Sequence, residues 1–351
     1  MIAFDMNVIE RGVRGIFARE FITRQRKAKY PLFCTIVDSD KKEEKYNAIS
    51  TLPTLSEMKD ERKLAGFSEY TYTITNKVYA TGIRVPRTLF EFDQTGQLRT
   101  LVQSLGARVA NFPDKLIWAL IASNDTCYDG SKFFSTTHDL GNHVEQSNIV
   151  EGLLTNSLLS ASTKEDRDNA IAAAQISVNK AIARMAEFED DRGEPWHDDI
   201  EPESLIILCH PEARFFIRSA VEAAQINATG NLMLKQVGKV LAINRPEIFK
   251  DSGGTVRKGT FYLLKVDTPI QPFIFQRFGP KVNFPDVIPE EDKAALQALQ
   301  AVEVQTIMRT GSDIDAMTFF NDEFFFGARV IYSAGFGMWQ NAVRVDANDA
   351  E

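Results

Sequence analysis

The chain has 351 residues, of which 44% are hydrophobic and 25% are charged, so it is long enough for two packed units with ordinary cores. This composition excludes a disordered chain, a collagen-like chain and a disulfide-rich scaffold, and the scattered cysteines Cys34, Cys127 and Cys209 fit free thiols in a reducing compartment. The formal net charge of -8 argues against a dedicated nucleic-acid binder, which normally carries a basic excess.

Residues 1–45 are predicted to form a leading arm that contains an amphipathic helix. They lack the apolar core of a signal peptide, and no stretch of the chain approaches the ~20 apolar residues needed to span a bilayer. Five apolar residues recur at helical spacing: Ile9, Val13, Ile16, Phe17 and Phe21. Between Arg11 and Lys29, seven basic residues accompany the single acid Glu20, so this surface is either a solvated face or a site for anions. The polar run 38–45 then predicts a linker.

An extended β segment is predicted next, over residues 67–87, with a bend at Asn76. Three of its apolar residues alternate with threonines, which is the period of a half-buried strand: Tyr70, Tyr72 and Ile74. Residues 94–124 then carry apolar side chains at three- and four-residue steps, which is typical of a long helix. Asp93 is its candidate N-cap, and Pro113 is expected to kink or divide it.

The second half of the chain alternates helices with short strands. Thr163 followed by Asp166 has the pattern of a capping box and predicts a helix over 163–188. The remaining predicted elements are a strand at 204–209, a helix at 212–225, strands within 240–284, a helix at 290–300 and strands within 315–345. Together these segments predict an α+β protein whose strands are mostly antiparallel.

The sequence contains no motif that indicates catalysis or cofactor binding. It has neither a glycine-rich phosphate loop nor the nucleophile elbow of a hydrolase. His138 and His143 form the only close histidine pair, but they are five residues apart in a glycine-containing loop and lack a third ligand. We therefore predict that the protein is not an enzyme and has no catalytic residue, no cofactor and no metal. An enzyme would have to draw its residues from distant parts of the chain.

Phenylalanine is abundant, at 25 residues, and part of it lies on segments that are predicted to be extended. Segments such as 1–45 and 67–87 are not expected to bury their aromatic side chains by themselves. Large apolar residues on elements of this kind usually pack against another chain. This pattern predicts obligate assembly.

Several blocks of sequence resemble the Mu-like major head subunits of tailed phages. FSEYTYTITNKVYATGIRVPRTLFEFD (67–93) is similar to the family's β segment that enters a long helix, and LPTLSEMKDERKL (52–64) to the turn and short helix before it. FPDKLIWALIASNDTCYDGSKFFSTTH (112–138) resembles the end of that helix and the family's Asp-Gly, Phe-Phe and His signature. NDEFFFGARVIYSAGFGMWQNA (321–342) resembles the closing strands. One departure is the absence of a tryptophan near Met58.

The resemblance implies the Hong Kong 97-like capsid fold, an α+β architecture with five segments. These would be an N-terminal arm (1–45), an extended β E-loop (46–85), a first part of the peripheral domain with the long spine helix (86–149), an inserted axial domain (150–312), and a second part of the peripheral domain with the C-terminal tail (313–351). Because the arm of this fold lies toward the inner surface, the resemblance also implies that four basic residues face packaged DNA: Arg11, Arg14, Arg24 and Lys27.

By the same resemblance the chain is expected to be the major capsid protein of a tailed bacteriophage. It would self-assemble through hexamers and pentamers into an icosahedral head around double-stranded DNA. Expected partners are a separately encoded scaffold, a maturation protease, the portal protein and a decoration protein, with no membrane. The expected location is the virion, and the host cytoplasm during assembly. One alternative is an encapsulin-type shell around protein cargo. A second, less favoured alternative is a metal-dependent hydrolase that uses His138 and His143.

Overall fold

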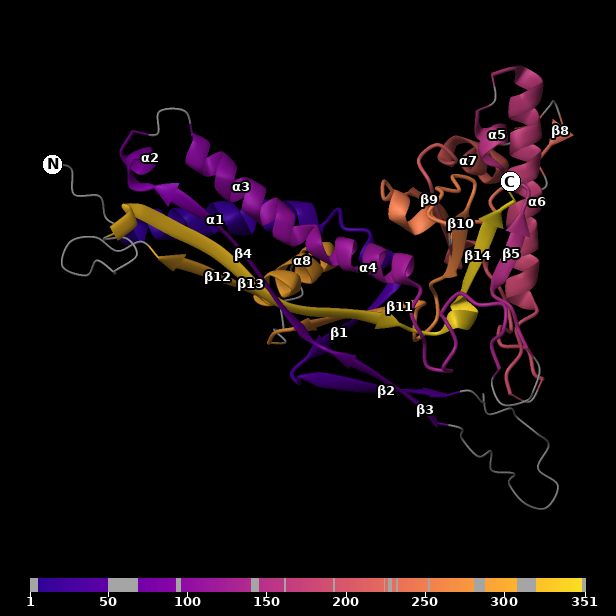
Figure 1. Ribbon diagram of the computed structural model, residues 1–351, viewed down its shortest axis with the longest axis horizontal. Coiled ribbons are helices and arrows are strands. Elements are labelled where there is room, and N and C mark those ends of the chain that lie inside the picture. Colours follow the sequence, from indigo (N-terminus) through magenta and orange to yellow (C-terminus); the bar gives the residue numbers. More distant parts are fainter. Residues whose placement is uncertain are drawn as a thin grey trace, which may run out of the picture.

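The computed structural model describes residues 6–49, 69–92, 96–139, 145–160, 162–191, 193–223, 225–226, 229–231, 233–251, 253–280, 288–307 and 320–348. Figure 1 shows an elongated unit, in which helices lie along a sheet, joined at one end to a more compact unit built around a second sheet. A two-stranded hairpin extends away from the elongated unit (Figure 1). The two larger sheets have five strands each.

The sheet of the elongated unit is organised around one long strand, β13 (Glu323–Phe336). One edge of β13 pairs with β4 (Lys77–Pro86). Its other edge pairs with β12 (Val302–Ile307) and, further along, with β11 (Phe273–Phe278). β11 in turn pairs with β1 (Cys34–Ser39). Alternate residues of β13 are buried on one face, as the period of a strand requires. β11 and β12 thus join this sheet, although they lie in the segment expected to be inserted.

Helices α1 (Met6–Gln25) and α3 (Gln97–Ala110) pack together over this sheet. The predicted apolar stripe is confirmed, because Val13, Phe17 and Phe21 are at most 4% exposed. Gly106 permits the close crossing, since a Cβ there would lie 2.9 Å from the Phe17 carbonyl oxygen. The expectation that the arm cannot bury its aromatic residues alone is therefore wrong. The helix packs on its own chain.

The long helix predicted over 94–124 is divided into two. α3 ends before Asn111, and α4 (Phe112–Ser123) begins there with Pro113 in its first turn, as expected for a residue that lacks a backbone donor. The predicted N-cap at Asp93 is wrong, because α3 is preceded by Gly96 in the left-handed region, at φ 70°. A separate short helix, α2 (Arg87–Phe92), ends before it, and glycine adopts this conformation without strain.

The hairpin consists of β2 (Glu43–Ile49) and β3 (Glu69–Thr75), paired antiparallel. The bend predicted at Asn76 is confirmed, since it separates β3 from β4. The linker predicted over 38–45 is wrong in its extent, because Asp38 and Ser39 end β1, residues 43–45 begin β2, and only residues 40–42 connect the two strands. The Asn76 side-chain amide donates to the Lys41 carbonyl at 2.8 Å and to the Ser39 hydroxyl at 2.9 Å. These bonds hold the connection in place.

The sheet of the compact unit is mixed and has the order β5-β14-β10-β6-β9. Its strands are β5 (Ile149–Gly152), β14 (Ala342–Ala347), β10 (Phe261–Lys265), β6 (Leu205–Cys209) and β9 (Lys239–Ala242). Helix α6 (Lys164–Ala186) packs on it and carries the predicted capping box of Thr163 and Asp166. The smaller elements are α5 (Asn156–Leu159), α7 (Arg214–Glu222), β7 (Gln225–Ile226) and β8 (Thr229–Gly230).

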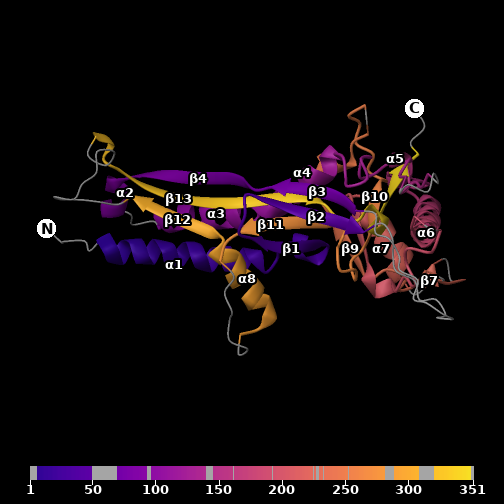
Figure 2. The ribbon, with the colours of Figure 1, turned by 90° about the horizontal axis from the view of Figure 1, so that it is seen from below.

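One further helix belongs to the elongated unit, α8 (Glu290–Gln300), which contacts α1 and β12. Figure 2 shows α8 projecting from the side of this unit, while β4 runs along its opposite edge. The core is continuous between the two units, and large aromatic side chains such as Phe133, Phe273 and Trp339 lie fully buried in it. In the described part of the chain, seven of the ten strand pairs are antiparallel, which confirms the predicted preference.

Candidate functional site

The loop that follows α4 is built around a buried polar cluster. Asn124 adopts the left-handed conformation at the end of α4, and its side chain exchanges two hydrogen bonds with the backbone of Phe134, at 2.7 and 3.0 Å. A short bridge joins Thr126 to Lys132, and Gly130 turns the chain between them at φ 84°, a value that favours glycine. The loop therefore has a defined shape without a helix or a long strand.

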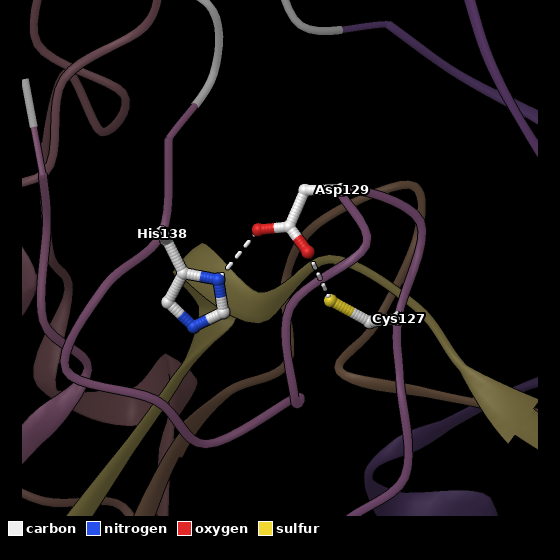
Figure 3. Close-up of side chains that lie close together, drawn as sticks. All are labelled: Cys127, Asp129 and His138. Carbon is white, nitrogen blue, oxygen red and sulfur yellow. Dashed lines mark hydrogen bonds and ion pairs between the residues drawn. The ribbon is translucent and has the colours of Figure 1, made fainter. Parts of the chain in front are cut away.

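Three side chains of this loop point toward one another in its interior (Figure 3). The His138 Nδ1 atom lies 2.6 Å from Asp129 Oδ2, and the Cys127 thiol donates to Asp129 Oδ1 at 2.9 Å. The backbone N–H of Ser131 also donates to Asp129, at 3.0 Å. The side chains of Asp129 and His138 are fully shielded from solvent. Asp129 is thus the acceptor at the centre of the cluster.

The segment near the C-terminus completes the surroundings of the cluster. The ring of His138 stacks on the ring of Trp339, with centroids 4.1 Å apart and planes 8° apart. Phe188 packs edge-on against Trp339. The outer ring nitrogen of His138, Nε2, has no hydrogen-bond partner in the described part of the chain. The cluster therefore joins the loop to a segment that lies far away in the sequence.

Burial and hydrogen bonding set the protonation of the two acidic groups. Burial, together with the nearby Asp129 carboxylate, raises the pKa of the Cys127 thiol far above its usual value. Burial also acts to raise the pKa of Asp129, but hydrogen bonds from His138 and Cys127 outweigh it and leave that pKa below its usual value. The cluster thus contains an ionised carboxylate beside a protonated thiol.

This arrangement does not support nucleophilic chemistry. A catalytic cysteine needs a histidine to take its proton, whereas here the carboxylate lies between the thiol and the imidazole. Ligand atoms of Cys127, Asp129 and His138 do lie within 4.8 Å of one another, close enough to surround a metal ion. The Cys127 thiol and His138 Nδ1 are already hydrogen-bonded to Asp129, however, and His143 lies outside the described residues. The absence of a metal at His138 stays a prediction.

The four basic residues expected to face DNA do not form one free cluster. Arg14 pairs with Glu10 and Arg24 pairs with Glu20, each at 2.8 Å and one helical turn apart. Arg11 and Lys27 are exposed and form no ion pair with any residue that the structure describes. The helix therefore neutralises part of its own charge.

Sequence patterns do not reveal the partnership of Cys127, Asp129 and His138. They indicate a free thiol at Cys127, and for His138 a histidine pair and a place in the family's signature. The Asp-Gly turn two residues after the cysteine was the one local signal, because it folds the loop back on itself. Trp339 gave no signal at all, since nothing near it in the sequence points to the loop.

The chain matches the family described as Mu-like prophage major head subunit gpT over residues 6–164 and 247–349, which is most of its length. The chain belongs to this family. Because these proteins are structural head subunits, the expectation that the chain is not an enzyme is confirmed. The fragment 165–246 between the two matched ranges includes most of α6 and all of α7.

Two relatives of this head subunit are known from their sequences. The Mu-like prophage FluMu major head subunit of Haemophilus influenzae is 33% identical over 123 residues, which are 34% of this chain and 40% of that protein. The major capsid protein of Escherichia phage Mu is 31% identical over 133 residues, which are 35% of this chain and 44% of that protein. The alignments thus span less than half of either relative.

Solved phage capsids share the fold. The head subunit is similar to the capsid of the cyanophage P-SCSP1u, with 12% identity and a TM-score of 0.51 over 92% of this chain and 89% of that one. The mature capsid of bacteriophage PhiM1 matches with 10% identity and a TM-score of 0.53 over 92% and 88%. The α+β fold is therefore that of phage capsid proteins. No helix among the described residues is long and apolar enough to span a bilayer.

Proposed function

We propose that this chain is the major capsid protein of a tailed bacteriophage, which assembles into an icosahedral head around double-stranded DNA. The observation that carries the proposal is the match to the major head subunit family on both sides of the compact unit's helices. The relative from phage Mu bears the name major capsid protein. Shape supports the same conclusion, because an elongated unit with a projecting hairpin offers contacts on several sides.

In the Hong Kong 97-like arrangement, each part of the chain would have its own place. Residues 1–45 would form the arm, 46–85 the E-loop with the β2–β3 hairpin, and 86–149 with 313–351 the peripheral domain. The inserted segment, 150–312, would supply the axial domain. A domain is expected to contain the strands of its own sheet. Pairing of β11 with β13 therefore favours ending that insertion before β11, and pairing of β14 with β10 favours placing β14 with the axial domain.

Partners follow from the same proposal. The chain would contact further copies of itself in hexamers and pentamers, and a scaffold, a maturation protease, a portal protein and a decoration protein during the life of the particle. Packaged DNA would contact the arm through phosphates only. Assembly would take place in the host cytoplasm, and the finished protein would reside in the virion.

Electron microscopy of the expressed chain tests the proposal directly. With its scaffold where one is required, the protein should form closed particles of megadalton mass that also sediment rapidly. A preparation that remains monomeric under all such conditions would contradict the proposal. Particles filled with a single protein instead of DNA would favour the encapsulin-type alternative.

A further inference from the structure

The long strand β4 lies at an edge of the main sheet, and its outer side is unpaired. β4 pairs with β13 along ten residues in an unbroken register, from Lys77 opposite Tyr332 to Pro86 opposite Glu323. No strand in the described part of the chain pairs with its other side. Figure 2 shows β4 along the outer edge of the elongated unit. Such an edge is a template for a further strand.

The register determines which backbone groups of β4 point outward. The Arg87 amide donates to the Asp322 carbonyl at 2.9 Å, one step beyond the end of the ladder. Because antiparallel strands bond through every second residue, the odd-numbered residues of β4 face β13. The N–H and C=O groups of four even-numbered residues therefore point away from the sheet: Val78, Ala80, Gly82 and Arg84.

These four residues are all exposed, and Val78 is 58% exposed. Over this stretch β4 is long and regular and its proline is at the end, so among the four residues only Arg84 offers the charge that usually protects an edge strand. An exposed valine beside unpaired backbone groups is disfavoured in a chain that stays alone. The edge thus has the properties of a contact surface.

A groove of about 790 Å³ runs beside this edge, between β4 and the helices α3 and α4. Its charged residues are all basic: Arg108, Lys115 and Arg245. Arg108 and Lys115 form no ion pair with a described residue, and Arg245 reaches Glu247 only at 4.0 Å with both side chains about half exposed. None of the described residues that line the groove carries a carboxylate. Alternate side chains of a strand added to β4 would enter it.

We propose that β4 accepts an extended, carboxylate-bearing segment of a second copy of this chain as an additional strand. The backbone groups of Val78 to Arg84 would bind the strand, and the groove cations would select its acidic side chains. The chain itself carries an acidic segment outside its helices and strands: Asp198, Asp199 and Glu201 are exposed within four residues that contain no base and that precede the 3-10 turn Pro202–Ser204. The inference rests on the proposed function, because it names a contact through which the shell subunits associate.

A proline at position 80 tests the backbone part of the proposal. Ala80→Pro removes one outward N–H and leaves the ladder to β13 intact, because the Ala80 amide does not face β13. Ala80→Thr is the matched control, since it keeps the N–H and suits a strand. We expect both variants to unfold at the same temperature. The yield of particles should fall about tenfold or more for the proline variant, because a loss of ~1.4 kcal/mol per contact weakens that contact tenfold.

Normal assembly of a folded Ala80→Pro variant would overturn the inference while leaving the proposed function intact. Failure of the unaltered chain to assemble would instead overturn the proposed function, on which the inference depends. Should the proline variant not fold, the double variant Arg108→Glu with Lys115→Glu replaces it, because both side chains are on helix surfaces. Lys164→Glu with Lys180→Glu, on α6, makes the same change of charge elsewhere.

We expect the groove variant to lose assembly about tenfold relative to the α6 variant. A photo-crosslinking residue in place of Val78 then identifies the segment that binds β4. Copies labelled with heavy nitrogen are mixed with unlabelled copies, so that crosslinks between copies can be told from crosslinks within one copy. The expected product joins a labelled copy to an unlabelled one at a segment that contains Asp or Glu. Equal assembly of the two charge variants, or crosslinks confined to single copies or to another protein, would overturn the inference.

Discussion

Asp129 is the central hydrogen-bond acceptor of the buried cluster in the loop after α4. It is fully shielded, it is ionised, and it accepts hydrogen bonds from Cys127, Ser131 and His138. A buried carboxylate of this kind stabilises only while its partners remain, because removing one of them leaves the others desolvated and unpaired. The stacking of His138 on Trp339 extends the effect to the C-terminal segment.

Asp129→Asn should therefore destabilise the chain by about 3 kcal/mol. The amide keeps the shape of the carboxylate but loses its charge, and its NH2 group replaces one of the two oxygens that accept hydrogen bonds. Asp125→Asn is the control, because Asp125 is an exposed carboxylate of the same loop and should change stability by less than about 0.5 kcal/mol. Urea unfolding of both variants measures the difference. Equal midpoints would show that the cluster is not a stabilising feature.

The same residue should make stability depend on pH. The pKa of Asp129 is lower in the folded chain than its ordinary value of 3.8, so its contribution is fully present above that value. It is lost as the pH falls through the lower, folded value. We expect the stability difference between the unaltered chain and Asp129→Asn to shrink in acid below about pH 4. If the stability difference between the two proteins stays constant from pH 7 to pH values well below the ordinary pKa of an aspartate, this prediction is wrong.

The three cysteines should remain free and unreactive in the folded protein. All are buried, and burial raises the pKa of Cys209 to about 12 and the pKa of Cys34 well above its usual value. Since the thiolate is the reactive form, a thiol reagent should modify them only after unfolding, and particle stability should not depend on reductant. Covalent oligomers that collapse with dithiothreitol would refute this prediction.

Metal analysis tests the prediction that this cluster binds no metal. We expect no stoichiometric metal in purified particles, because the Cys127 thiol is protonated and donates to Asp129, whereas a metal would need the thiolate. His138→Ala should then destabilise the chain equally with and without a chelator. Bound zinc that disappears in this variant would show that the three side chains form a metal centre after all.

At the scale of elements, the crossing of α1 and α3 determines how the arm is held. The helices approach so closely at Gly106 that a methyl group there would meet the Phe17 backbone. The arm is also tied to α4, where the Asp114 carboxylate accepts the N–H groups of Lys29 and Tyr30 at 3.1 and 2.8 Å. Residues 6–30 are thus a packed part of the elongated unit.

Two glycines on these helices should respond in opposite directions to alanine. Gly106→Ala should destabilise by roughly 1–3 kcal/mol, because backbone atoms must move to admit the methyl group. Gly12→Ala, where nothing lies within 4 Å of the added Cβ, should stabilise by roughly 0.5–1 kcal/mol, since alanine favours the helix. Thermal unfolding of the two variants measures both signs. Stabilisation by both would show that the helices can separate without loss.

At the scale of the whole molecule, net charge and local charge differ. The chain carries -8 overall, yet the arm helix has a basic excess that ion pairs to Glu10 and Glu20 only partly neutralise. A basic inner surface would reduce the repulsion between a negative shell and DNA phosphates. Contacts of this kind are independent of DNA sequence and weaken steeply with salt.

Changing Arg11, Arg14, Arg24 and Lys27 to glutamine should leave empty shells intact and reduce the yield or stability of filled ones. Since Arg11 and Lys27 are exposed and lack ion pairs within the described chain, changing these two alone should have most of the effect. Arg14→Gln with Arg24→Gln is the matched comparison. If empty shells fail to form, the arm charges act between subunits and the DNA-facing hypothesis is wrong.

The sequence alone determined the local elements and the family. The apolar stripe of α1, the capping box of α6 and the alternation of β3 depend on residues a few positions apart, so they could be predicted without a structure. The resemblance in blocks 67–93, 112–138 and 321–342 identified the head subunit family, which the family match confirms.

Only the tertiary structure decided which distant segments meet. It brings Trp339 onto His138, closes the turn between β1 and β2 with Asn76 and covers the aromatic side of α1 with α3. Among the strands that the structure describes, it leaves one edge of β4 without a partner. Periodicity indicates that a face is buried but not what buries it. The partner depends on the path of the whole chain, and the chain packs its arm on itself because a glycine in α3 lets two helices approach closely.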